Sequence, residues 1–140
     1  MSNYVRAMNE DFGENTEVRI IDMRNEIEKV LEVMREDYKR WSHWSSSYKP
    51  NPHSDKTIMN EMIEDYCNGL EVSEGSRYWK ITSGRRNQRS VSGFIVKAGD
   101  KKFREGDLLK PAGWAAPARN FARGNVLDGD LGGVRWTGIG

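Results

Sequence analysis

Apolar residues recur every three or four positions between Ile20 and Trp41, which is the spacing of one buried face of an α-helix. Charged residues fill most of the positions between them. The pattern predicts a helix from residue 16 to about residue 44, with Asn15 or Thr16 as its N-terminal cap. The apolar stripe consists of Ile20, Met23, Ile27, Val30, Leu31, Met34, Tyr38 and Trp41.

A second helix is predicted after a loop. Residues 42–52 show no periodicity and contain two prolines, so we expect a loop there. Ser54 is a suitable N-cap for a helix that ends at Asn68 and Gly69. Methionines on both stripes are expected to fill the core, although such residues also form adaptable binding grooves. The second helix carries Ile58, Met59, Met62, Ile63 and Tyr66.

From Ser76 onward, short β-prone runs are separated by glycine. Residues 78–82 and 91–97 are predicted strands, joined by a polar turn over residues 83–88. We expect another strand at Leu108 and Leu109, and the run 134–137 is expected to close the sheet. The predicted fold class is α+β: two acidic N-terminal helices packed with a small C-terminal antiparallel β unit, for which a curled, barrel-like form is one option.

Charge is distributed unevenly along the chain. Residues 1–75 carry 9 basic and 16 acidic side chains, a net charge of −7, whereas residues 76–140 carry 13 basic and 5 acidic ones, a net charge of +8. We therefore expect an acidic helical region (1–75) and a basic β-rich region (76–140) within one compact domain. Two interpretations stay open: the regions attract each other within the fold, or the basic region binds an anionic ligand.

Residues that commonly carry catalysis are few. The histidines, His43 and His53, fit no metal-binding or nucleophile-elbow spacing, and Cys67 falls near a helix end where a buried, inert thiol is expected. Asp128 and Asp130 lack the further ligands of a calcium loop, and no phosphate-binding glycine motif occurs. These observations favour a protein without catalytic residues, metal or cofactor, and leave a nuclease or hydrolase as the weaker alternative.

Basic and amide side chains gather around three predicted loops of the second half. Arginine and asparagine suit phosphate oxygens and base edges, and aromatic rings stack on bases. We therefore expect a binding site for nucleic acid or a nucleotide, whereas filling a small core is the alternative role of the aromatic residues. The candidate ligand-binding residues are Arg85, Arg86, Arg89, Lys101, Lys102, Arg104, Trp114, Arg119, Asn120, Arg123 and Asn125; the interleaved aromatic residues are Tyr78, Trp79, Trp114, Phe121 and Trp136.

The segment from residue 110 to residue 126 is the strongest candidate. Long loops in compact domains usually have a function, because ordering them costs conformational entropy. A helical turn over residues 116–122 would place Arg119 and Arg123 on one side. The alternative is that both arginines pair with the acidic helices.

Five blocks of the chain, residues 69–81, 93–96, 103–110, 116–126 and 135–138, carry a family resemblance. They resemble a family of small proteins of unassigned activity that tailed bacteriophages encode. The resemblance implies an accessory protein in the cytoplasm of an infected host bacterium, and it assigns no catalytic residue. It leaves two functions open: binding of nucleic acid or a signalling nucleotide through the basic region, or inhibition of a host or antiviral-defence protein through the acidic helices, which would mimic nucleic acid by their charge. Because no apolar run is long enough for a membrane span, no membrane partner is expected.

Overall fold

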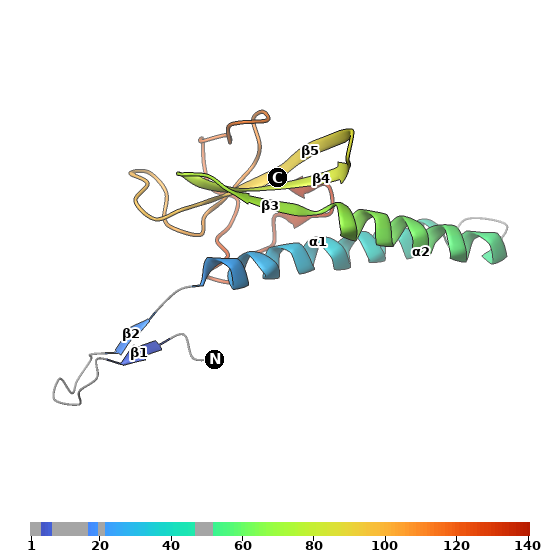
Figure 1. Ribbon diagram of the computed structural model, residues 1–140, viewed down its shortest axis with the longest axis horizontal. Coiled ribbons are helices and arrows are strands. Elements are labelled where there is room, and N and C mark those ends of the chain that lie inside the picture. The colour runs from blue at the N-terminus through green and yellow to red at the C-terminus, as the bar shows by residue number, and fades with distance from the viewer. Residues whose placement is uncertain (1–3, 7–16, 20–21, 47–51) are drawn as a thin grey trace.

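The computed structural model describes residues 4–6, 17–19, 22–46 and 52–140. Strands β3 to β6 form an antiparallel sheet in the order β3-β4-β5-β6, and β1–β2 and β7–β8 form two separate antiparallel pairs. Helix α1 runs along one face of the sheet and extends beyond its end, where α2 packs against it as the second arm of a helical hairpin and leads back into β3 (Figure 1). The predicted α+β fold, with the helices packed against an antiparallel sheet, is confirmed. The elements are β1 (Tyr4–Arg6), β2 (Glu17–Arg19), α1 (Met23–Ser46), α2 (Pro52–Gly69), β3 (Glu71–Glu74), β4 (Tyr78–Arg85), β5 (Gln88–Val96), β6 (Leu108–Leu109), β7 (Val134–Arg135) and β8 (Gly138–Ile139).

Helix α1 begins later than its apolar stripe predicted. The helix starts at Met23, and Asp22 caps it, because the Asp22 Oδ1 accepts the Arg24 N–H at 3.1 Å. Residues 17–19, which were predicted to be helical, form β2 instead. They pair with β1 in the register Val5↔Val18, so strand pairing prevails over the local helical spacing here.

The connection between the helices is shorter than the predicted loop. Helix α1 continues through Ser46, and α2 already begins at Pro52, a residue whose fixed φ suits the first turn of a helix. Ser54, the predicted N-cap, therefore lies within α2. The predicted caps of the first helix, Asn15 and Thr16, lie outside the described residues, as does the centre of the predicted loop, residues 47–51.

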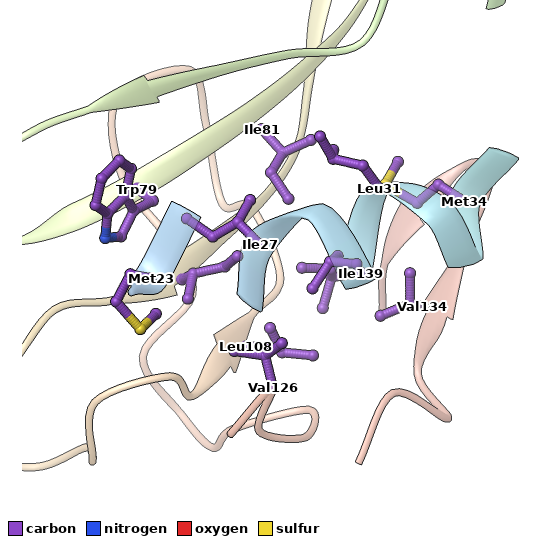
Figure 2. Close-up of a cluster of buried hydrophobic side chains, with 12 residues drawn as sticks. Met23, Ile27, Leu31, Met34, Trp79, Ile81, Leu108, Val126, Val134 and Ile139 are labelled. Carbon is purple, nitrogen blue, oxygen red and sulfur yellow. The ribbon is translucent and has the colours of Figure 1, made fainter. Parts of the chain in front are cut away.

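The main hydrophobic core lies between α1, one face of the sheet and the C-terminal strands. Figure 2 shows α1 side chains beside Trp79 and Ile81 of β4 and beside Val134 and Ile139 of the C-terminal pair. Each large side chain buried here contributes about 1.5–3 kcal/mol of transfer free energy, so the core joins the acidic and basic regions firmly. Its buried members are Met23, Ile27, Val30, Leu31, Met34, Trp79, Ile81, Ile95, Leu108, Val126, Val134 and Ile139.

The sheet stays open, and the barrel-like form and the closing strand were wrong. Strands β3 and β6 are its edges and are not paired with each other. Helix α1 covers one face, so the strands bury that face without curling onto themselves. Residues 134–135 pair with β8 rather than with the sheet. The Ile139 side chain of β8 instead lies against Gly93 of β5, where any side chain on Gly93 would overlap it.

The predicted hairpin at residues 78–97 is confirmed and is longer than expected. Strand β4 runs to Arg85 and β5 begins at Gln88, so the turn is confined to residues 86–87. Strand β3, which follows the predicted end of the second helix and was not predicted as a strand, pairs with β4 in the register Val72↔Ile81. No helix in the part of the chain that the structure describes is both long enough and apolar enough to cross a membrane.

Candidate nucleic-acid interface

The face of the sheet opposite α1 carries the candidate site. Side chains alternate between the two faces of a strand, so directly paired residues share a face. Lys80, Phe94 and Leu109 are successive partners across β4, β5 and β6, and their chain neighbours pack against α1. Lys80 therefore points away from the helices. A second, smaller core lies on this face and consists of Phe94, Val96, Phe103 and Leu109.

The segment that follows β6 runs over this face without the helical turn predicted for residues 116–122 (Figure 1). Two of its N–H groups donate to carbonyl oxygens at or next to β6, rather than to the preceding turn of a helix. The Ala118 N–H donates to the Lys110 carbonyl at 2.7 Å, and the Arg123 N–H donates to the Leu108 carbonyl at 2.7 Å. Between these two bonds the chain reverses direction: Pro111 and Pro117 are antiparallel partners, and the Ala112 N–H donates to the Ala116 carbonyl at 3.0 Å. The returning chain therefore lies beside Lys110 and β6.

Two aromatic side chains on this segment are exposed. Trp114 and Phe121 each have 55% of their surface accessible to solvent. Lys80 Nζ lies 4.3 Å from the Trp114 ring centroid and donates to the Trp114 carbonyl at 2.9 Å. Arg123 Cζ lies 4.0 Å from the Phe121 ring centroid. Each exposed ring thus has a cation beside it, at a distance that favours cation–π attraction.

Lys102 adds a third cation beside the same segment. Its Nζ donates to the carbonyl oxygens of Arg119 and Asn120. The Asn120 Oδ1 accepts the Phe121 N–H at 3.0 Å, which fixes the backbone at the exposed ring. We call this set the cation–aromatic face; it consists of Lys80, Lys102, Trp114, Asn120, Phe121 and Arg123.

Arg119 fastens the segment to the turn that follows β5. Its guanidinium donates to both carboxylate oxygens of Asp100, at 2.9 and 3.0 Å, and to the Tyr78 hydroxyl at 2.6 Å. The Asp100 side chain is 3% exposed and also accepts the Lys102 and Phe103 N–H groups. The bond from Arg119, helped by these two N–H groups, holds the pKa of Asp100 well below its usual range. Arg119 therefore pairs within the basic region rather than with the acidic helices.

Replacing Arg119 by alanine is expected to lower the Tm at pH 6 by about 5 °C or more, because the Asp100 carboxylate loses its bidentate cation and keeps only the longer contact with Arg77 at 3.5 Å. The lowered pKa of folded Asp100 sets the sign of the pH dependence. Its stabilisation is present above the unfolded pKa of about 4 and is lost as the pH falls towards the folded pKa. Differential scanning calorimetry should show the Tm gap between wild type and Arg119→Ala shrinking between pH 6 and pH 3. A gap that is absent at pH 6, or that widens in acid, would contradict the pairing.

Two other predicted ligand residues are engaged inside the fold. Asn125 is 3% exposed, and its Nδ2 donates to Asp107 Oδ1 at 2.8 Å. Arg89 Nη2 donates to the Gly69 carbonyl at 2.7 Å and to Thr82 Oγ1 at 2.8 Å. Both side chains therefore tie segments of the protein together, and their polar groups are already satisfied by protein atoms.

Three further predicted residues, Arg85, Arg86 and Arg104, lie outside the cation–aromatic face. Arg85 and Arg86 are exposed at the β4–β5 turn, the opposite end of that hairpin from the Tyr78↔Val96 pair. Arg104 pairs with Asp128. In the part of the chain that the structure describes, no three His, Cys, Asp or Glu side chains are placed to hold a metal ion.

A cleft of about 490 Å³ lies beside the face. Arg77, Lys97, Lys101 and Arg119 line it, and Asp100 is the acidic residue in its wall. Lys97 also pairs with Glu74 outside the cleft at 2.6 Å. The cleft thus has more positive than negative charge and extends the electropositive character of the neighbouring cation–aromatic face.

Part of the opposite charge of the two regions is paired within the fold. Among the described residues, three ion pairs join basic side chains of the region 76–140 to acidic side chains before residue 76: Arg85–Asp65, Arg89–Glu71 and Lys97–Glu74. They bring the two regions together at the α2–β3–β4 side of the molecule. None of these pairs uses a residue of the cation–aromatic face.

Lys80 was not among the predicted ligand-binding residues, although the sequence contained a signal for it. In the run 78–81, Trp79 and Ile81 alternate with Tyr78 and Lys80, which places Lys80 on the face opposite the main core. The predicted aromatic residues lie in different environments, some buried and some exposed. Trp79 entered the main core and Trp136 packs against the helices, so only Trp114 and Phe121 of that predicted set are strongly exposed.

The fold and the site define an α+β protein that has a helical hairpin on one side of an open antiparallel sheet and a cation–aromatic face on the other. The chain belongs to DUF7717, a family of unknown function, whose family model matches residues 3–138. The match includes both the helical and the β-rich region. Comparisons with curated proteins and with solved structures found no match.

Proposed function

We propose that this protein binds single-stranded nucleic acid through the cation–aromatic face and acts without catalysis. The observation that carries the proposal is the pair of exposed rings, Trp114 and Phe121, each beside a cation on one segment. Bases stack on such rings while cations contact the phosphates, and this combination is the usual way in which proteins bind single strands.

The composition of the segment supports a polyanionic ligand. Residues 108–127 contain Lys110, Arg119 and Arg123 and no acidic residue. Two exposed rings on one segment offer two stacking positions, which suit a strand with several unstacked bases better than one nucleotide. A duplex keeps its bases stacked on each other, so the rings would gain little from it. The basic cleft beside Arg119 supplies further positive charge for the strand.

We also propose a cellular setting for this function, on the sequence resemblance to phage-encoded proteins. A small accessory protein that binds nucleic acid stoichiometrically would act in the cytoplasm of an infected bacterium. A signalling nucleotide, which has the same phosphate and base chemistry, is the second ligand to test.

Fluorescence anisotropy of labelled oligonucleotides titrated with the full chain tests the proposal. We expect saturable binding to single strands that is at least about tenfold tighter than binding to a duplex of the same sequence, because stacking contributes roughly 1–3 kcal/mol per base. Affinity should fall between low and near-physiological salt, as phosphate contacts require.

The outcomes separate charge from stacking. Equal affinity for single strands and duplex would show that charge alone attracts the ligand, which contradicts the role of the two rings. Flat titrations at both salt concentrations, with saturable binding of a cyclic or linear nucleotide, would assign the face to a small ligand and overturn the nucleic-acid proposal.

A further inference from the structure

The helical hairpin carries large apolar side chains where it extends beyond the sheet (Figure 1). The exposed fractions are 39% for Trp41, 62% for Trp44, 54% for Ile58 and 44% for Met62. Trp41, Ile58 and Met62 belong to the stripes that predicted a buried face, and the core role expected of Met62 was wrong. The sheet ends before it reaches them, so these side chains are left at the surface.

An aromatic cluster lies at the base of this exposed region. The Tyr38 and Tyr66 rings stack with centroids 4.4 Å apart, and the Trp136 ring lies 5.0 Å from both Tyr38 and Trp41. The Tyr66 hydroxyl donates to the Trp136 carbonyl at 2.7 Å. A cavity of about 440 Å³ opens here, with Tyr38, Met62, Tyr66 and Trp136 in its wall.

The exposed side chains are aligned along both helices. Ile58, Met62 and Tyr66 follow each other at intervals of four on α2, and Trp41 and Trp44 continue from Tyr38 at intervals of three on α1. Residues three or four apart lie on the same side of a helix. The apolar strip, which we define as Trp41, Trp44, Ile58 and Met62, thus runs along the hairpin from the aromatic cluster. An elongated amphipathic helix matches such a strip better than a compact ligand.

Acidic side chains border the strip on α2. Around the helix, Glu61 and Asp65 come next after Ile58 and Met62 on the side away from the core. Residues 58–70 contain no lysine or arginine. Asp65 has a weak, exposed partner in Arg85 at 3.9 Å, and the ion pairs found among the described residues include none for Glu61.

We propose that the apolar strip docks a basic amphipathic helix of another protein. The apolar face of that helix would cover Trp41 and Met62, and its lysines or arginines would lie against Glu61 and Asp65. The same carboxylates would repel an anionic membrane surface. This inference is independent of the cation–aromatic face, which lies on the other side of the sheet.

Three synthetic peptides of equal length test the docking surface. The first is an amphipathic leucine/lysine helix, the second has glutamate in place of every lysine, and the third has the composition of the first in an order without helical periodicity. Anisotropy of the labelled peptides, titrated with the full chain at near-physiological salt, should show the first binding at least about tenfold tighter than either control.

Variants of the protein assign the binding to the strip. The double variant Trp41→Ser with Met62→Ser should lose at least about tenfold in affinity for the basic amphipathic peptide. The double variant Glu61→Gln with Asp65→Asn should reduce the preference for the basic over the acidic peptide. Trp114→Ala is the matched control and should bind like wild type. Thermal unfolding shows whether each variant is folded, and Ile58→Ser is the second strip variant if the first double variant unfolds.

Three results would overturn the proposal. Equal binding of the unpatterned basic peptide would show attraction by charge without docking. Binding of anionic vesicles through Trp41 would assign the strip to a lipid surface. A dimer in analytical ultracentrifugation that Trp41→Ser dissociates would assign it to a second copy of this chain. Nucleic-acid binding is measured separately, so failure here leaves the proposed function standing.

Discussion

Replacing Trp114 and Phe121 together by alanine is expected to weaken binding to a single-stranded oligonucleotide by roughly 30-fold or more. Each stacked base is worth about 1–3 kcal/mol, and about 1.4 kcal/mol corresponds to tenfold in affinity. Both rings are more than half exposed, so the double variant should stay folded and lose little stability, which thermal unfolding checks. The bond from Lys80 to the Trp114 carbonyl uses the backbone and survives the substitution.

The salt dependence of nucleic-acid binding separates the contribution of the aromatic rings from that of the cations. The alanine double variant should keep the wild-type slope of log affinity against log salt, because it removes no charge. Arg123→Ala or Lys102→Ala should instead reduce the slope by about 0.7 for each phosphate contact that is lost. Arg86→Ala, which removes the same charge at the far end of the β4–β5 hairpin, is the matched control. If the double variant binds a single strand as tightly as wild type, the cation–aromatic face is not the binding site.

Asn125→Ala is expected to destabilise the protein by about 3 kcal/mol, or roughly 10 °C in Tm, because it leaves buried polar groups without partners. The Asn125 Nδ2 donates to the Asp107 carboxylate at 2.8 Å and to the Glu105 carbonyl at 3.1 Å, while its Oδ1 accepts the Leu127 and Asp128 N–H groups. Chemical denaturation with a two-state fit measures this loss.

The substitution Asn125→Asp is expected to make the stability of the protein depend on pH through the same buried site. A second carboxylate beside Asp107 would repel it, so one of the two should keep its proton to a higher pH than usual in the folded state. The variant should therefore be least stable at neutral pH and recover part of its stability as the pH falls towards 4.5. Asn120→Ala, an exposed amide on the cation–aromatic face, serves as control and should change stability little. Wild-type stability of Asn125→Ala would show that the buried network is not made in solution.

Local patterns predicted the parts of the fold that depend on near neighbours in sequence. The stripe of α1 was right from Met23 to Tyr38, because a spacing of three and four residues places side chains on one face whatever covers them. The hairpin of β4 and β5 was right because a polar turn separates two β-prone runs. The members of the proposed binding face were harder to predict. Composition pointed to Trp114, Phe121 and Arg123, but it also pointed to Asn125 and Arg89, which bond to Asp107 and Gly69, 18 and 20 residues away in sequence.

The sequence by itself determined the α+β class, the two helices, the β4–β5 hairpin and the division into an acidic and a basic region, since each depends on local spacing or on counting charges. Only the tertiary structure decided which side chains those patterns bury. β2 and β3 are strands because β1 and β4 pair with them. Trp41 and Met62 are exposed because the sheet ends before it covers the hairpin, whereas Trp79 is buried because α1 lies over it. Burial depends on what lies opposite a side chain, and contacts between residues distant in sequence decide that.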